Sequence, residues 1–145
     1  MNQQEWERSI PEDITGDILW TVEAYRLALF LSDIGWADVT KLFQDRRTIS
    51  LADQLYRSVG SIGANIAEGY SRGTGKDRAR FYEYALGSGR EARDWYYKAR
   101  HVLGQQVVEH RINLCTQLIK LLLIMVRQQR GSPIREVTDA YDIDS

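Results

Sequence analysis

The sequence predicts an all-α protein folded as an antiparallel, up-and-down four-helix bundle. Long segments carry apolar residues at helical spacing, and no segment shows the strict alternation of a strand. The two prolines, Pro11 and Pro133, lie outside these segments, so nothing interrupts the helices. Four helices joined by short connections run antiparallel to their neighbours. The apolar arcs of the first and last helices are wider than an isolated bundle needs, which predicts a homo-oligomer.

The first predicted helix begins after Asp17, whose side chain suits an N-cap, and ends near residues 33–35. The following connection, residues 36–47, fits either a short helix or an extension of the first. The predicted organisation is a poorly ordered leader at residues 1–16, the bundle at residues 17–130 and an acidic tail at residues 131–145.

The second helix begins at Ser50 and ends where three glycines occur between residues 69 and 75. Its core stripe consists of Leu51, Leu55, Val59, Ile62 and Ile66.

The third helix is capped by Thr74 or Asp77, and Gly104 is its C-terminal glycine. The fourth begins near Val107 and ends before Gly131.

Composition indicates one soluble domain of 145 residues, of which 43% are hydrophobic and 27% charged. The single cysteine, Cys115, excludes an intrachain disulfide and suits a reducing compartment. The first seven residues lack the pattern of a signal peptide. The longest apolar run, residues 118–126, is too short to cross a bilayer. We therefore expect a cytoplasmic protein without a membrane partner.

Charge is divided unevenly along the chain. Residues 1–45 hold three basic and nine acidic side chains, residues 46–130 hold fifteen and seven, and residues 131–145 hold one and four. A basic middle between acidic ends suits a polyanion-binding surface. It equally suits neutralisation of the basic body by the acidic ends, within the fold or the oligomer.

Small residues are concentrated in the middle of the second and third helices. Gly60, Gly63, Gly87 and Gly89 each cost about 1 kcal/mol relative to alanine in a helix. We expect close approach between helices, or to a partner, to offset that cost.

Catalysis has little support in the sequence, and we predict no catalytic residue, metal site or cofactor. The two histidines lie nine residues apart, and no phosphate-binding loop or nucleophile motif occurs. Asn65, Glu68 and Glu91 are open to an acid–base role. The interpretation we favour is that they form hydrogen bonds that fix helix register.

A set of basic residues is the better candidate for binding. Arg90, Arg93, Tyr97 and Arg100 share one face of the third helix, where arginine suits phosphate and tyrosine suits base stacking. A second basic group, at the preceding turn, consists of Arg72, Lys76, Arg78 and Arg80. The alternative is a subunit interface, or a solvated face paired with Glu83 and Asp94.

The segment from Ser61 to Gly69 reads Ser-Ile-x-x-Asn-Ile-Ala-Glu-Gly. A basic, glycine-rich turn follows, then Phe81 and a Gly-Ser-x-x-Glu step at Gly87, Ser88 and Glu91. On these residues the chain resembles the bacterial four-helix-bundle family of 23S rRNA intervening-sequence proteins. The resemblance assigns a structural role to Ser61, Asn65, Glu68, Gly69, Phe81, Gly87, Ser88 and Glu91.

The resemblance implies an antiparallel bundle that assembles as a ring-like homo-oligomer, expected to be a pentamer. More distantly, the chain is similar to the accessory proteins of diversity-generating retroelements, which bind nucleic acid and a reverse transcriptase. Its near-neutral net charge of −1 departs from that basic class.

The function expected from the sequence is non-enzymatic binding of RNA or other nucleic acid by an oligomeric bundle. The alternative is a scaffold or adaptor for a protein partner, such as a reverse transcriptase or a ribosome-associated factor.

Overall fold

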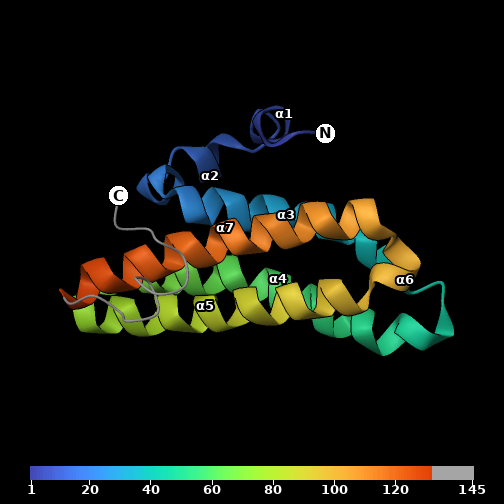
Figure 1. Ribbon diagram of the computed structural model, residues 1–145. Coiled ribbons are helices and arrows are strands. Elements are labelled where there is room, and N and C mark those ends of the chain that lie inside the picture. Colours follow the sequence, from blue (N-terminus) through green and yellow to red (C-terminus); the bar gives the residue numbers. More distant parts are fainter. Residues whose placement is uncertain (132–145) are drawn as a thin grey trace.

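A computed structural model describes residues 1–131, which are almost entirely helical and contain no strand. Consecutive long helices run in opposite directions, as the colours of Figure 1 show. The predicted all-α class is confirmed. The predicted tail, apart from Gly131, lies outside the described residues. The four long helices are α3 (Glu23–Leu42), α4 (Ile49–Tyr70), α5 (Gly75–Lys98) and α7 (Gln105–Arg130).

The long helices pack around one apolar core. Helix α5 lies against both α4 and α7, and α3 contacts the same two helices from the other side. The predicted stripe of α4 faces this core, since Leu55, Val59, Ile62 and Ile66 are fully buried and Leu51 is half-buried. Helical periodicity therefore identified the face correctly.

The start of the chain differs from the expected loose leader. Residues 1–16 contain two short helices, α1 (Gln3–Glu7) and α2 (Glu12–Thr15). Trp6 is buried, packs on Phe30 of α3 with ring centroids 5.4 Å apart, and donates to Asp33 at 2.7 Å. The N-terminal segment therefore covers apolar surface of the first long helix.

The first long helix begins and ends later than expected. Asp17 caps a short 3₁₀ helix, η1 (Ile18–Thr21), and extended Val22 separates it from α3. Helix α3 then continues through Gly35 to Leu42, so residues 36–42 of the connection extend this helix, and a short 3₁₀ helix follows at residues 46–48. Gly35 does not end the helix. It is buried in the core, and a Cβ at this position would lie 3.4 Å from the Tyr96 hydroxyl.

Two further short helices lie at the end of the bundle opposite the α4–α5 turn. They are η2 (Arg46–Thr48), before α4, and α6 (Arg100–Leu103), before α7. The predicted N-cap of α5 is present, since the Thr74 hydroxyl accepts from the Asp77 amide. Helix α5 itself ends at Lys98 with Ala99 as its C-cap, and Gly104, expected at that end, instead follows α6 with a φ of 87°.

The four glycines inside α4 and α5 differ in their surroundings. A Cβ on Gly63 or Gly89 would make ordinary contact at 3.6 Å with a neighbouring helix. Gly60 and Gly87 meet nothing within 4 Å and are exposed. A Cβ would therefore fit at all four positions, so close approach within the chain does not explain these glycines, and approach to a partner stays a prediction.

The wide apolar arc of α7 leaves no exposed stripe on this helix. Its apolar side chains are all buried or half-buried in the chain. Helices α3 and α5 cover much of the arc between them, and five apolar side chains of α7 are only half-buried, so part of the arc stays accessible in the single chain, as expected.

Candidate nucleic-acid interface

The predicted basic face of α5 lies along its groove with α7. Arg93 is half-buried and donates to the Thr116 hydroxyl of α7 at 3.2 Å. Arg90 is half-buried one turn earlier, and Tyr97 is exposed one turn later. Helical periodicity therefore places charge and an aromatic ring on the side of α5 next to α7.

Tyr97 and Arg100 form a pre-arranged pair at the end of this face. The guanidinium of Arg100 lies 4.1 Å from the centroid of the Tyr97 ring, and its Nη1 donates to the Tyr97 carbonyl at 3.0 Å. The tyrosine side chain nevertheless remains 53% exposed. An aromatic surface and a cation are thus held together in contact with solvent.

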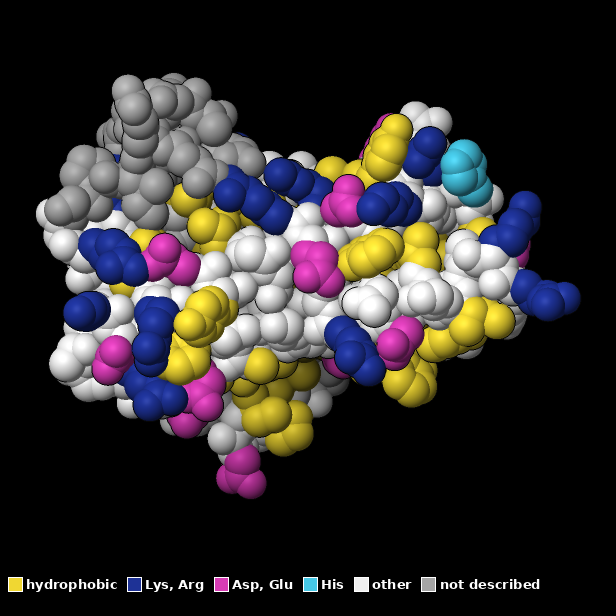
Figure 2. All heavy atoms as spheres, turned by 90° about the horizontal axis from the view of Figure 1, so that it is seen from below, with side chains coloured by type: hydrophobic (Ala, Val, Ile, Leu, Met, Phe, Trp, Pro, Cys, Tyr) yellow, Lys and Arg dark blue, Asp and Glu magenta, His cyan; other side chains and the backbone are white. Residues whose placement is uncertain are grey.

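An open pocket of about 560 Å³ adjoins this pair, where α5, α6 and α7 meet. Its apolar floor includes Val108, which is buried, and Ile112, which is half-buried. Polar groups surround the floor, and Figure 2 shows basic, histidine and hydrophobic side chains together at this end. The residues lining the pocket are Tyr97, Arg100, His101, Gln105, Val108, Glu109 and Ile112.

The second predicted basic group lies at the α4–α5 turn, where its arginines contact other parts of the turn. Arg72 pairs with Glu68 at 3.1 Å and lies over the Phe81 ring, and Arg80 lies over the same ring. Arg78 donates to the Arg72 carbonyl at 2.8 Å. Figure 2 shows basic and acidic side chains mixed at this end. Lys76 is exposed in the first turn of α5.

The structure does not bring the two basic groups together. The nearest members along α5, Arg80 and Arg90, are ten positions or about 15 Å apart, and Arg78 is about 28 Å from Tyr97. The acidic residues named as alternative partners bind elsewhere, since Asp94 pairs with Lys98 at 2.8 Å and Glu83 pairs with Arg130. The groove and the turn are therefore two separate surfaces.

The motif residues of α4 and α5 connect the two helices. Asn65 donates to the backbone carbonyl and the hydroxyl of Ser61, and the Ser88 hydroxyl donates to the Ser61 hydroxyl at 3.0 Å. A Cβ on Gly69 would lie 2.7 Å from the Tyr82 ring, so only glycine fits there without a shift. This geometry matches a structural role for the motif.

Glu91 faces outward and accepts from the indole nitrogen of Trp95 at 3.1 Å. Glu68, Asn65 and Glu91 thus each form a hydrogen bond within their own helix or the turn that follows it. They lie on different parts of the α4 and α5 surface.

Residues 21–123 match the family described as 23S rRNA-intervening sequence protein. The chain belongs to this family. A crystal structure of a protein of unknown function from the S23 ribosomal protein family of Bacteroides thetaiotaomicron has a similar fold, with a TM-score of 0.67 and 22% identity. The similarity covers 72% of this chain and 98% of that one. No curated protein matches the chain.

The family match spans all of α4 and α5, and so includes both basic groups. Within residues 1–131 of this family member, no helix has the length and apolar character needed to cross a membrane.

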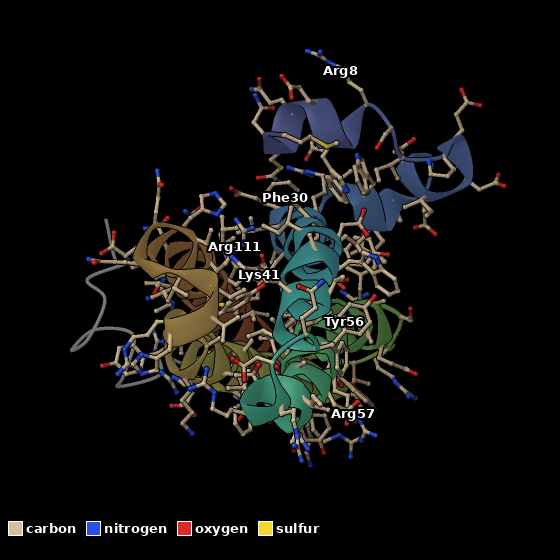
Figure 3. The ribbon with its side chains drawn as sticks, turned by 90° about the vertical axis from the view of Figure 1, so that its right-hand side faces the viewer. Arg8, Phe30, Lys41, Tyr56, Arg57 and Arg111 are labelled. Atoms are coloured by element: carbon tan, nitrogen blue, oxygen red, sulfur yellow. The ribbon has the colours of Figure 1, made fainter. Side chains whose placement is uncertain are left out.

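A buried ion pair, which the sequence did not predict, lies beneath the pocket end of this 23S rRNA-intervening sequence protein. Arg111 of α7 binds Asp38 of α3 through two nitrogens, at 2.8 and 3.1 Å, and the Tyr96 hydroxyl donates to the same carboxylate at 2.8 Å. Figure 3 shows Arg111 between the two helices. Burial, followed by the negative charge of Asp38, raises the pKa of Tyr96, so the phenol remains a donor.

A signal for this pair was present in the sequence. Asp38 shares the apolar stripe of α3 with Leu31 and Leu42, and Arg111 shares that of α7 with Cys115 and Leu118. Opposite charges on two apolar stripes indicate a buried pair.

Exposed aromatic residues gather on another surface of this family member, near the α3–α4 connection. The Trp36 side chain is 63% exposed and meets Tyr56 of α4 edge-on, with ring centroids 5.7 Å apart. Figure 3 shows Tyr56 on the outer side of α4. Phe43 and Ile49 are also exposed in this part of the chain. This surface suits contact with another protein.

Proposed function

We propose that this protein is a non-enzymatic helical-bundle protein that binds RNA or other nucleic acid through the α5–α7 groove. One observation carries the proposal: the exposed Tyr97 ring is held under Arg100 at the edge of an open pocket. A stacking surface next to a cation is the arrangement that binds single-stranded nucleic acid.

The groove supplies the two kinds of contact that such binding needs. Arg90 and Arg93 of α5 and Arg100 at the start of α6 can neutralise successive phosphates. Tyr97 lies between Arg93 and Arg100 and offers an uncharged contact to a base. The turn group is a weaker candidate, because the open pocket beside Tyr97 and Arg100 includes none of its residues.

Binding by the intact protein is tested by fluorescence anisotropy with labelled RNA and DNA strands over a salt series. We expect affinity to fall as salt rises, with a logarithmic slope of about −0.7 per phosphate contacted on a single strand. Absence of binding at about 50 mM salt, where electrostatic attraction is weakly screened, would contradict the proposal.

We further propose that the chain assembles into a homo-oligomer, and that the family resemblance points to a ring of five up-and-down bundles in the cytoplasm. The exposed aromatic surface around Trp36 and Tyr56 supports assembly, since a solvated monomer gains nothing from it. Repetition of the groove in each subunit would strengthen binding through avidity.

Sedimentation equilibrium at micromolar concentration tests the assembly. A mass several times 16.8 kDa is expected, and Trp36→Ser should reduce it. A wild-type monomer would contradict this part of the proposal.

The aromatic surface also favours a second candidate function, a scaffold for a protein partner such as a reverse transcriptase or a ribosome-associated factor. In that case the wild-type chain would form a stable oligomer or complex and bind no nucleic acid. The salt series and the sedimentation experiment together separate the two functions.

A further inference from the structure

The pocket beside Tyr97 has features that a general phosphate-binding face does not require. It has an apolar floor, a cation on one side and a carboxylate, Glu109, among its other lining groups. Its volume of about 560 Å³ is within the range of small-molecule sites. From this combination we propose that the pocket binds a guanine nucleotide of a single strand. The inference rests on the proposed function and names the base that the groove selects.

The cation of the pocket is ordered before any ligand arrives. Arg100 is fixed by its contact with the Tyr97 ring and by its hydrogen bond to the Tyr97 carbonyl. A guanidinium has five N–H donors, so this bond leaves others for a phosphate. Pre-ordering reduces the entropy lost on binding.

The carboxylate is likewise oriented by a neighbour. Glu109 accepts a hydrogen bond from the side-chain amide of Gln105 at 2.8 Å, one helical turn away on α7. A carboxylate has about four acceptor sites, so it can take further donors. An anion beside an apolar floor and a stacking ring repels phosphate but suits the donor edge of a base.

Guanine matches this arrangement better than the other bases. Its Watson–Crick edge presents two adjacent donors, N1–H and the 2-amino group, which together fit a carboxylate. Adenine and cytosine each present one amino group beside a ring acceptor, and uracil presents one N–H between two carbonyls. A base lying on Tyr97 with its edge toward Glu109 would keep its phosphate near Arg100, and Arg93 continues the groove.

The same chemistry is available from a free nucleotide. The groove favours a strand, because Arg93 lies one turn along α5 from Tyr97 and can take a neighbouring phosphate. Free guanosine monophosphate lacks that second phosphate contact and should bind more weakly.

The test uses the intact protein and labelled uridine decamers carrying one central guanosine, inosine or adenosine. Inosine lacks only the 2-amino group. We expect the guanosine strand to bind about tenfold more tightly than the inosine strand, the effect of one charge-assisted hydrogen bond. Glu109→Gln should bring this ratio close to one, and Tyr97→Ala should weaken all three strands about tenfold or more.

Asp53→Asn is the matched control, because it makes the same change of charge at an exposed carboxylate of α4 outside the pocket. It should leave the guanosine-to-inosine ratio at about ten. Circular dichroism checks that each variant keeps its fold.

Equal binding of the three strands by the wild-type protein would overturn the guanine site while leaving nucleic-acid binding intact. Guanosine monophosphate binding as tightly as the guanosine strand would overturn the assignment to a strand. If no strand binds, the proposed function fails. Titration with guanosine monophosphate then judges the pocket alone: binding supports a guanine site, and no binding overturns it.

Discussion

The two ends of the bundle carry similar residue types and use them differently. At the α4–α5 turn, a Cβ on Gly69 or Gly75 would lie within 2.7 Å of a neighbouring atom, and the arginines bind local carboxylates, carbonyls and rings. At the other end, Gly104 meets nothing within 4 Å and an open pocket lies beside Tyr97. An arginine cluster therefore indicates a binding surface only where its surroundings leave room for a ligand.

The largest expected effect concerns the ion pair beneath the open end of the bundle, which is the end that carries the pocket. Asp38→Ala should lower the free energy of unfolding by about 3–5 kcal/mol, because it removes the carboxylate that the half-buried Arg111 and the buried Tyr96 hydroxyl share. Urea denaturation followed by circular dichroism measures the loss. Asp53→Ala, which removes the exposed pair with Arg57, should change stability by less than about 1 kcal/mol.

A triple variant separates the cost of burying charge from that of losing packing. Asp38→Leu with Arg111→Met and Tyr96→Phe should recover most of the stability lost in the single variant, since an apolar cluster of similar size avoids the desolvation cost and leaves no buried hydroxyl without an acceptor. A loss below about 1 kcal/mol in Asp38→Ala would show that the open end does not depend on this pair.

The next largest effect concerns the tight end of the bundle, which is the α4–α5 turn, and two glycines test its packing. Gly69→Ala should cost about 1–3 kcal/mol, because its Cβ would lie 2.7 Å from the buried Tyr82 ring. Gly87→Ala, at an open position of α5, should instead stabilise the helix by about 1 kcal/mol. Thermal unfolding of both variants compares them directly. Similar melting temperatures for the two would mean that the α4–α5 end is not close-packed.

The contrast between the ends also shows what the sequence could predict. Local chemistry identified the Thr74 cap, and periodicity identified the buried stripe of α4. Each of these depends on residues a few positions apart, where spacing is informative.

Long-range packing decided the rest. Gly35 resembles a helix end in sequence, yet it lies inside α3 where the Tyr96 hydroxyl approaches. Asp38 and Arg111 are 73 positions apart, so their pairing depends on how two helices are placed. The pocket likewise needs the position of α7 relative to α5, which no local pattern supplies.

A smaller effect compares the two basic groups in nucleic-acid binding. Arg93→Ala should reduce the magnitude of the logarithmic salt slope by about 0.7, the contribution of one single-strand phosphate. Arg80→Ala, at the turn, should leave the slope unchanged, because Arg80 lies over Phe81 about 26 Å along the helix from Tyr97 and its pocket. Anisotropy titrations at several salt concentrations measure both slopes. An equal reduction in the two variants would place the turn within the binding surface.

The smallest effect is the response of the two ends to acid. At the end that carries the pocket, Asp45 caps η2, the short helix before α4. The Asp45 carboxylate accepts hydrogen bonds from the side chain and the backbone of Arg47, and these bonds lower the Asp45 pKa to about 2. The folded-state pKa lies below the unfolded value near 3.9, so the cap stabilises the fold above that pH and loses its effect as the pH falls toward 2. Thr74, the cap at the tight end, does not ionise in this range. Asp45→Asn should therefore reduce the acid sensitivity of the amides at residues 46–48, measured by NMR between pH 5 and pH 2, and leave those at residues 75–77 unchanged. Equal acid responses at the two ends in the wild-type protein would assign the effect to global unfolding instead of the Asp45 cap.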